Sequence, residues 1–170
     1  MKRIVKAAVR FFMNPARRGL FFLAALGLFA FVDFSVSGLV RRTFVFYSIR
    51  SGEATVEDRM IRSSSSRETD IRRYVEEALL GPVSPNSAPL FPRDTRLDSF
   101  LYRDGVVYAD LSESAVLPPP EGGDVFRNFL TLYRGIRRNF PYVKDVRLFA
   151  AGREAYVEEF RRIFSEENEK

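Results

Sequence analysis

The stretch Asp70–Pro82, with the sequence DIRRYVEEALLGP, decides the fold class of this 170-residue chain. Its apolar residues recur at positions i, i+3, i+4, i+7 and i+8, the spacing of one face of an amphipathic helix. Gly81 and Pro82 end the helix, because glycine adopts the left-handed cap conformation and proline cannot continue the hydrogen-bonding pattern. Ser65, with Glu68 three residues later, predicts a capping box at its start. This helix needs an apolar surface against which to pack.

Segments rich in β-branched and aromatic residues lie on both sides of this helix. Thr43–Ile49 and Ala54–Ile61 are strand candidates separated by a short turn, so we expect a hairpin before the helix. Arg96–Tyr102 and Val106–Leu111 form a second expected hairpin around Asp104-Gly105, a dipeptide typical of tight turns. The chain therefore has a sheet on which the helix can pack.

Two further helices and a strand complete the expected fold. Four prolines favour an extended loop over residues 82–93. A helix capped by Asp124 is expected to reach Asn139, and Gly135 within it either allows close packing or has no role. Its expected inner face is Phe126, Phe129, Leu130, Tyr133, Ile136 and Phe140. Val143–Ala150 is a last strand and Glu154–Phe164 a C-terminal helix. The class is α+β, with one small mixed or antiparallel sheet and two to three helices packed on it.

The net charge of +5 is concentrated in the N-terminal tail. Residues 1–18 carry six basic groups and no acid, residues 19–40 carry only one acid, and residues 41–170 carry 21 basic and 21 acidic groups. The three contributions are +6, −1 and 0. The part that folds is neutral overall, so it lacks the basic footprint of a nucleic-acid-binding domain, and no nucleic-acid partner is expected.

Residues 19–40 have the composition of a transmembrane anchor. These 22 residues include a single charge, Asp33, and as a helix they would span about 33 Å, enough to cross a hydrocarbon core of about 30 Å. Since the basic tail 1–18 precedes them, the positive-inside rule places the N-terminus in the cytoplasm and the remainder outside. We expect a single-pass protein of the cell membrane, with the lipid bilayer as a partner and an extracytoplasmic domain.

Two features of this segment leave alternatives open. Asp33 either pairs with a partner helix or lies near the outer third of the bilayer, where it is protonated or reaches water. Ser35-Val36-Ser37 resembles a signal-peptidase site, so the alternative to an anchor is a cleaved signal and a secreted protein. The 18-residue basic region before the apolar segment favours the anchor.

The sequence offers no catalytic, cofactor-binding or metal-binding constellation. The chain has no cysteine and no histidine, which excludes disulfides, thiolate chemistry, the usual zinc ligands and a histidine base. The serine cluster Ser63–Ser66 has no group suited to activating a nucleophile. We therefore expect a protein that is not an enzyme and that carries no cofactor.

The order of residues from Glu68 to Gly152 resembles that of a GerMN domain, a module named for a spore germination and sporulation protein. The signature stretches are a helix end, a Pro-x-x-Thr-x-Leu entry into the hairpin, the second hairpin strand, and the passage into the last strand. The residues that carry the resemblance are Leu80, Gly81, Pro82, Pro92, Thr95, Leu97, Gly105, Asp110, Leu111, Ser112, Pro141, Val146 and Gly152.

The resemblance implies a bacterial, non-enzymatic module outside the cytoplasm on a membrane or lipid anchor. It divides the chain into a basic tail (1–18), an anchor (19–40), a GerMN-like domain (43–152, core 68–152) and a C-terminal helix with a charged tail (153–170). The domain is similar to ring-building modules, so we expect an assembly or scaffold role with other envelope proteins or with itself. The alternative is a small-ligand or cell-wall-binding domain, which requires a concave pocket with convergent polar groups.

Overall fold

A computed structural model describes residues 15–119, 123–160 and 162, with the backbone alone at 16–17 and 33–37. The chain divides into two compact units, Met1–Leu39 and Val40–Lys170.

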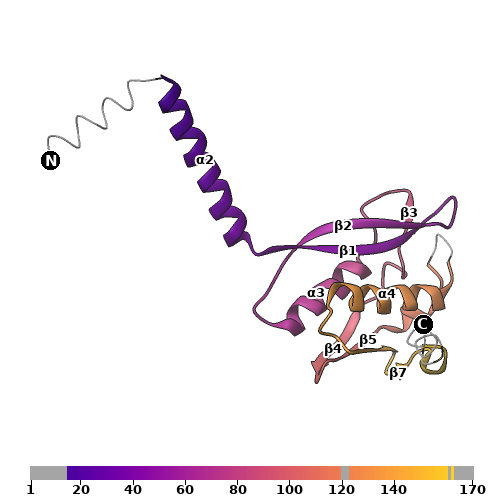
Figure 1. Ribbon diagram of the computed structural model, residues 1–170. Helices are drawn as coiled ribbons and strands as arrows, with labels where there is room; N and C mark the ends of the chain where they lie inside the picture. Colours follow the sequence, from indigo (N-terminus) through magenta and orange to yellow (C-terminus); the bar gives the residue numbers. More distant parts are fainter. Residues whose placement is uncertain (1–14, 120–122, 161, 163–170) are drawn as a thin grey trace. The chain divides into compact units, whose positions relative to one another are not determined.

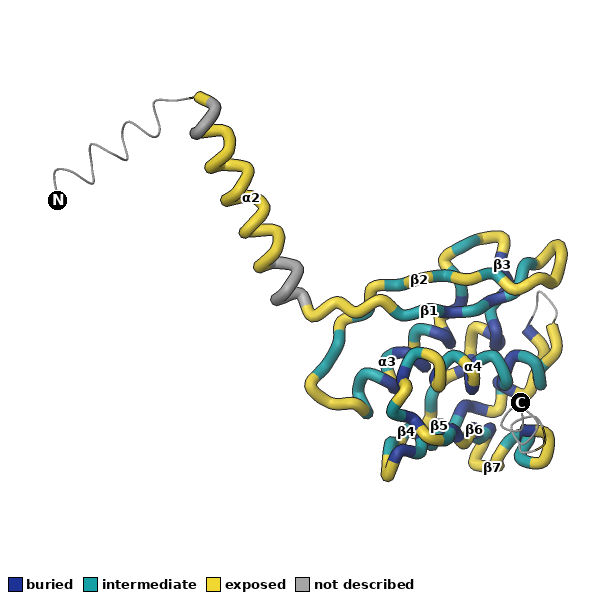
Figure 2. The backbone as a smooth tube through the Cα atoms, viewed as in Figure 1, coloured by how far each residue is buried: buried dark blue, intermediate teal, exposed yellow. Residues whose placement is uncertain are grey.

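The first unit contains helix α2, Pro15–Ser37. Its side chains from residue 18 to residue 32 are all exposed, as the continuous yellow of α2 in Figure 2 shows. Within the described residues, no helix combines the length and the apolarity that a membrane span requires. The side chains of Asp33 and Ser35–Ser37 lie outside the description, so the pairing of Asp33 and the cleavage site stay untested predictions.

The second unit follows the expected order of elements with two short strands added. The hairpin turn falls at Asp104 and Gly105, whose φ angles are 55° and 88°, as a two-residue turn requires. The elements are β1 (Leu39–Ser48), β2 (Ala54–Arg62), α3 (Arg67–Leu79), β3 (Ser87–Ala88), β4 (Leu97–Arg103), β5 (Val106–Leu111), the 3-10 turn η1 (Glu113–Val116), α4 (Val125–Asn139), β6 (Asp145–Ala150) and β7 (Arg153–Glu154).

The strands form two sheets, so the expectation of one sheet is wrong. One sheet has the order β2-β1-β3 and the other the order β4-β5-β6-β7. In the second sheet β5 pairs parallel to β6 and antiparallel to β4, so it is mixed, which is one of the two sheet types that the sequence left open. In Figure 1, α3 and α4 lie between the two sheets. The first hairpin forms a separate sheet because β1 packs on the helices through its side chains, as Phe44 does on Tyr74, and pairs its backbone only with β2 and β3.

Aromatic rings connect the first sheet to the helices. The ring of Phe44 on β1 stacks on that of Tyr74 on α3, with centroids 4.5 Å apart, and Tyr74 meets Phe140 edge to face at 5.7 Å. Asn139, the last residue of α4, accepts a hydrogen bond from the backbone N–H of Thr43 at 2.9 Å and donates to the Thr43 carbonyl at 2.8 Å. The amide thereby joins β1 to α4.

Gly135 of α4 is required for this packing, which settles the two alternatives left open by the sequence. A Cβ atom at this position would lie 2.3 Å from the Tyr74 hydroxyl oxygen. Burial raises the pKa of Tyr74, so its hydroxyl stays protonated, and it donates to the Thr43 carbonyl at 3.2 Å. The absence of a side chain therefore lets the tyrosine lie directly against α4.

Several local expectations require correction. Ser66, not Ser65, caps α3, and its side chain accepts from the Thr69 N–H. Glu68 accepts instead from the Tyr102 N–H on β4, because a tertiary partner outcompetes the local capping box. The inner face of α4 also includes the buried Leu132.

The proline-rich loop and the C-terminal segment also differ from expectation. Within residues 82–93, Ser87 and Ala88 form strand β3 against β1. Residues 153–154, expected in a helix, form β7 against β6, and helical structure begins only at Val157. Within the expected helix, residues 157–160 and 162 are helical, and residues 161, 163 and 164 lie outside the described residues.

Candidate binding groove

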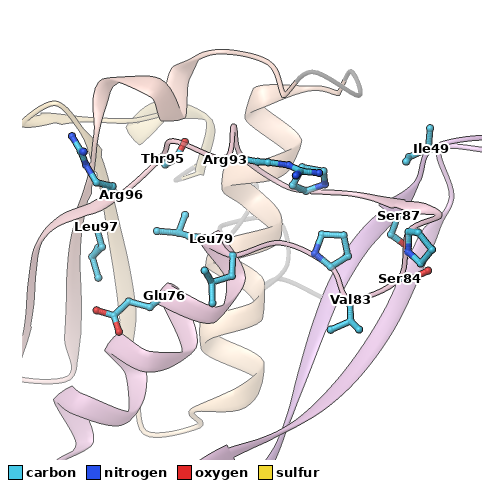
Figure 3. A pocket seen from close by; sticks show the side chains of 14 residues that line it. Ile49, Glu76, Leu79, Val83, Ser84, Ser87, Arg93, Thr95, Arg96 and Leu97 are labelled. Atoms are coloured by element: carbon cyan, nitrogen blue, oxygen red, sulfur yellow. The ribbon is translucent and has the colours of Figure 1, made fainter.

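An open groove of about 570 Å³ lies where α3 ends. Its walls are the end of α3, the loop of residues 82–89 and the segment 93–97, with Ile49 at one end. Figure 3 shows these side chains around the hollow, with Glu76 and Leu79 coming from α3. Four of the signature residues meet here, although they are up to 17 positions apart in sequence. They are Leu80, Pro82, Thr95 and Leu97.

The helix end sets the shape of the first wall. The Leu80 N–H donates to the Glu76 carbonyl at 3.1 Å and the Gly81 N–H to the Ala78 carbonyl at 3.2 Å. Gly81 has a φ of +85°, and a Cβ on it would lie 3.1 Å from the Cβ of Pro89. The turn leaves Leu80 78% exposed and Val83 80% exposed. Two large apolar side chains therefore project into solvent at the rim.

Two charged residues of β2 hold the loop in place behind the groove. Glu57 accepts hydrogen bonds from the Val83 N–H at 3.1 Å and the Ser84 N–H at 3.0 Å. Arg59 bonds Glu57 at 2.8 Å and donates to the Gly81 carbonyl at 2.6 Å. Burial acts to raise the pKa of Glu57, but the hydrogen bonds from Arg59 and the two N–H groups outweigh it, so that pKa is lowered.

The Arg59 guanidinium is buried against the aromatic side of the first sheet. Its carbon lies 4.8 Å from the ring centre of Phe44 and 5.4 Å from that of Phe46, a cation–π arrangement. It also donates to the Glu77 carbonyl at 3.1 Å, at the end of α3. A single side chain thus joins β2, the end of α3 and the groove loop.

The far wall carries polar groups. Thr95 is buried, its N–H donates to the Pro92 carbonyl at 2.9 Å, and its hydroxyl oxygen has no hydrogen-bond partner in the described part of the chain. Arg93 and Arg96 line the same wall and are exposed. The Arg96 main chain is fixed, because its N–H donates to the Ser112 hydroxyl at 3.0 Å and its carbonyl accepts from the Ser112 N–H at 2.9 Å.

The remaining signature residues lie outside the groove and set turns and register. The Gly105 carbonyl accepts a hydrogen bond from the Lys144 N–H at 2.7 Å. A Cβ atom on Gly105 would lie 2.9 Å from the Lys144 side chain. The Asp110 carboxylate accepts from the Gly152 N–H at 3.0 Å, and the Leu111 carbonyl accepts from Ala151 at 2.9 Å.

The last two signature residues are Pro141 and Val146. Pro141 is exposed just after α4, and Val146 is buried on β6. Most signature residues therefore either build the groove or align β5 with its neighbouring strands, and Pro141 does neither.

Sequence reasoning missed Glu57, Arg59 and Ile49 as parts of this site. Glu57 and Arg59 alternate with exposed residues along β2, so they share one face of the strand, and that alternation was the available signal. Nothing local places Ile49 beside the loop, since β3 brings them together only through its pairing with β1.

The described residues contain no group of three or more histidine, cysteine, aspartate or glutamate side chains placed to hold a metal ion. The groove presents an apolar rim, exposed arginine residues and one buried hydroxyl group to a ligand. These groups suit binding by apolar contact and hydrogen bonding.

The architecture is that of a GerMN-like domain. The first GerMN domain of the sporulation protein GerM from Bacillus subtilis aligns with a TM-score of 0.50 and 21% identity, over 69% of this chain and 86% of that domain. At this identity the similarity establishes the fold alone. No model of a protein family matches the sequence, nor does any curated protein.

Two further solved structures align over the same part of the chain. The tandem GerMN domains of GerM from Bacillus subtilis have 19% identity and a TM-score of 0.49, over 68% of this chain and 40% of theirs. A protein from Clostridium perfringens named as a lipoprotein has 19% identity and a TM-score of 0.43, over 68% of this chain and 77% of its own.

Proposed function

We propose that this chain is a non-enzymatic assembly module that is held at the cell membrane and binds another envelope protein through the groove at the end of α3. The observation that carries the proposal is the groove itself. It combines an exposed apolar rim, formed by Leu80 and Val83, with the exposed guanidinium groups of Arg93 and Arg96. Protein interfaces combine apolar anchors with arginine in this way.

The proposed anchor rests on the sequence of residues 1–40. The basic tail 1–18 is followed by 22 residues with one charge, and the described side chains of α2 are exposed. A bilayer would cover this apolar surface, with the basic tail in the cytoplasm. The fold it shares with a domain of a sporulation protein supports a role in the bacterial envelope.

The anchor and its orientation are tested in cells that produce the full chain. We expect the protein in the membrane fraction after alkaline carbonate extraction, with an intact N-terminus. A C-terminal alkaline phosphatase fusion should be active and a C-terminal green fluorescent protein fusion dark. Release by carbonate, or a mature start at Gly38, would show that residues 19–40 do not anchor the chain.

The groove is tested by charge placed at its rim. Leu80→Arg and Val83→Arg, both at exposed positions, should leave the thermal midpoint of unfolding nearly unchanged and abolish co-purification of the partner after cross-linking in cells. Leu101→Arg is the matched control, because Leu101 is 48% exposed on β4 and does not line the groove. Equal loss of the partner in the control would argue against the groove as its binding site.

A small ligand or cell-wall fragment is the second candidate occupant, favoured by the volume of the groove, which lies within the usual range for such sites. The buried Thr95 hydroxyl would supply one specific hydrogen bond. Peptidoglycan fragments applied to the full chain in detergent should raise its unfolding midpoint if this candidate is correct. No shift at millimolar concentration would exclude it in favour of a protein partner.

A further inference from the structure

The neutral second unit has its charges segregated along its length. Figure 1 shows the start of β1, the end of β2, the start of α3 and the end of α4 on one side of this unit. These four termini carry a set of arginines, which we name the basic end. Its members are Arg41, Arg42, Arg62, Arg67, Arg137 and Arg138.

The opposite side has the reverse balance. It includes the start of α4 and β7 (Figure 1). The turn η1 lies beside β7, because Glu113 and Val116 line one hollow with Arg153 and Glu154. The acidic residues of this side are Glu113, Asp124, Glu154, Glu158 and Glu159, accompanied by the basic residues Arg127 and Arg153. A net charge of zero over residues 41–170 therefore conceals a basic end and an acidic end.

Contacts within the basic end show that the arginines converge. Arg41 forms a salt bridge with Asp58, and Arg41, then Thr43 and at longer range Arg138 lower the pKa of that carboxyl group. Arg42 donates to the Asn139 carbonyl at 2.5 Å, and its guanidinium lies 4.2 Å from the centre of the Phe140 ring. The Asp58 carboxylate thus bonds one guanidinium group and lies within electrostatic range of a second.

Near the start of α3, an aromatic contact and hydrogen bonds likewise hold the basic end in place. The Arg67 guanidinium lies 4.8 Å from the Tyr142 ring centre. Burial and then Asp70 raise the pKa of Tyr142, and Arg42 and Arg67 act in the opposite direction. Arg73 donates to the Arg62 carbonyl at 2.9 Å. Of the acids on the first turn of α3, Asp70 accepts hydrogen bonds from Ser63 and Ser64, and Glu68 accepts from the Tyr102 N–H. The arginines outnumber the acids that face them.

We infer that the basic end binds the phosphate groups of anionic phospholipids. A guanidinium presents a planar fork of donors that matches a phosphate, and stacking on aromatic rings holds such a group in one orientation. We assign lipid phosphate as the occupant because only a short segment separates the end of the proposed membrane anchor from Arg41. Arg41 follows Ser37, the last residue of α2, by four positions, so it lies within about 14 Å of the helix end whatever the orientation of the unit.

This inference rests on the proposed membrane association and adds an orientation to it. Helix α3 begins at the basic end with Arg67 and ends at the groove with Leu79 and Leu80. Its 13 residues span about 20 Å. With the basic end against the headgroups, the groove is held away from the lipid surface, where a partner protein can reach it.

The test uses fluorescence transfer from the full chain in nanodiscs to a headgroup-labelled lipid. The chain has no cysteine, so single cysteines at Ser65 and Val83 accept a donor dye. Ser65 is exposed between β2 and α3, and Val83 is exposed at the groove. In nanodiscs with 30% phosphatidylglycerol we expect stronger transfer from position 65 than from 83. This difference should be lost in pure phosphatidylcholine and in 0.5 M salt, since screening shortens electrostatic range.

Charge reversal identifies the residues responsible. Arg137→Glu with Arg138→Glu should abolish the lipid-dependent difference, and so should Arg67→Glu alone. The second variant keeps the test valid if the first fails to fold, since an acid at the first residue of a helix is favoured by the helix dipole. The control is Arg153→Glu at the acidic end, which should retain the difference.

The outcomes separate the two proposals. A chain that is not recovered with nanodiscs would refute the membrane association itself. A chain that is recovered but shows equal transfer in anionic and neutral lipid would refute the basic end as a lipid site. If 10 mM inorganic phosphate removes the difference in phosphatidylglycerol nanodiscs at constant ionic strength, the arginines form a site for free phosphate and the lipid assignment is wrong.

Discussion

At the scale of single residues, the structure depends on side chains whose importance is not visible from their immediate neighbours. Gly135 matters because Tyr74, on another helix, occupies the space where a Cβ would be. Glu57 matters because it binds two N–H groups of the loop that forms the groove. Both effects arise from residues far away in sequence, which explains why composition and periodicity left Gly135 undecided and Glu57 unnoticed.

Gly135→Ala should destabilise the second unit although alanine is the better helix former by about 1 kcal/mol. The new methyl group would lie 2.3 Å from the Tyr74 hydroxyl, and such overpacking typically costs about 1–3 kcal/mol. In a Tyr74→Phe background the nearest atom is removed, so the same substitution should cost less. Urea unfolding of the four proteins measures this coupling; additive effects would show that the close contact does not limit stability.

The contribution of Glu57 to stability depends on pH. Because its folded pKa is lowered below the ordinary value of 4.5, its stabilisation is complete above about pH 4.5 and is lost as the pH falls through the folded pKa. Glu57→Gln should therefore reduce the free energy of unfolding at pH 7, with a difference from the parent protein that shrinks on acidification. A difference that stays constant between pH 7 and pH 3 would contradict this account.

At the scale of elements, local sequence predicted helices and strands well and their environment poorly. The periodicity predicted a helix over Asp70–Leu80 and a strand over Val106–Leu111, and the structure has α3 at Arg67–Leu79 and β5 at Val106–Leu111. These predictions succeeded because the apolar stripe, the glycine at the helix end and the Asp-Gly turn all favour the same local structure. The separation of the first hairpin into its own sheet was not predictable, since the apolar face of a hairpin does not specify which surface covers it. The same holds for the groove, whose walls come together only through the pairing of β3 with β1.

The start of α3 gives a direct comparison between adjacent serines. Ser66→Ala removes the side chain that accepts from the Thr69 N–H, and loss of an N-cap typically costs about 1 kcal/mol. Ser65→Ala, at the position that a capping box predicted, should change stability much less because Ser65 is exposed and is not the cap. Thermal unfolding measures both; a larger loss for Ser65→Ala would restore the capping-box interpretation.

The side-chain amide of Asn139 is one of the polar contacts between α4 and β1, together with the hydrogen bonds of Arg42 to the Asn139 carbonyl and of Tyr47 to Thr131. Asn139→Asp keeps the oxygen that accepts from the Thr43 N–H but loses the donor to the carbonyl groups of Thr43 and Gly135. The Thr43 carbonyl keeps the hydrogen bond from the Tyr74 hydroxyl, so the expected cost is that of one lost hydrogen bond, about 0.5–1.5 kcal/mol. Hydrogen exchange should then show β1 opening at lower free energy than α3. Unchanged protection of β1 would show that the Asn139 amide is not needed to hold the first sheet on α4.

At the scale of the whole molecule, the proposed function depends on three parts of the chain. They are an apolar N-terminal helix, the basic end, and the groove at the end of α3. Charge counting along the chain located the basic tail and gave zero for the remainder. It did not reveal the segregation of charge, which arises because the fold brings the ends of two strands and two helices to one side of the second unit (Figure 1). The central claim is that the groove, held at the membrane, receives another envelope protein.

Site-specific photo-cross-linking in living cells tests that claim most directly. A benzophenone amino acid at Val83, on the groove rim, should yield one discrete cross-linked product with an envelope protein, and Leu80→Arg in the same chain should abolish it. The same probe at Leu101, on β4, should not yield that product. Cross-linking that is equal at the two positions, or that persists with Leu80→Arg, would contradict the assignment of the groove as the site of assembly.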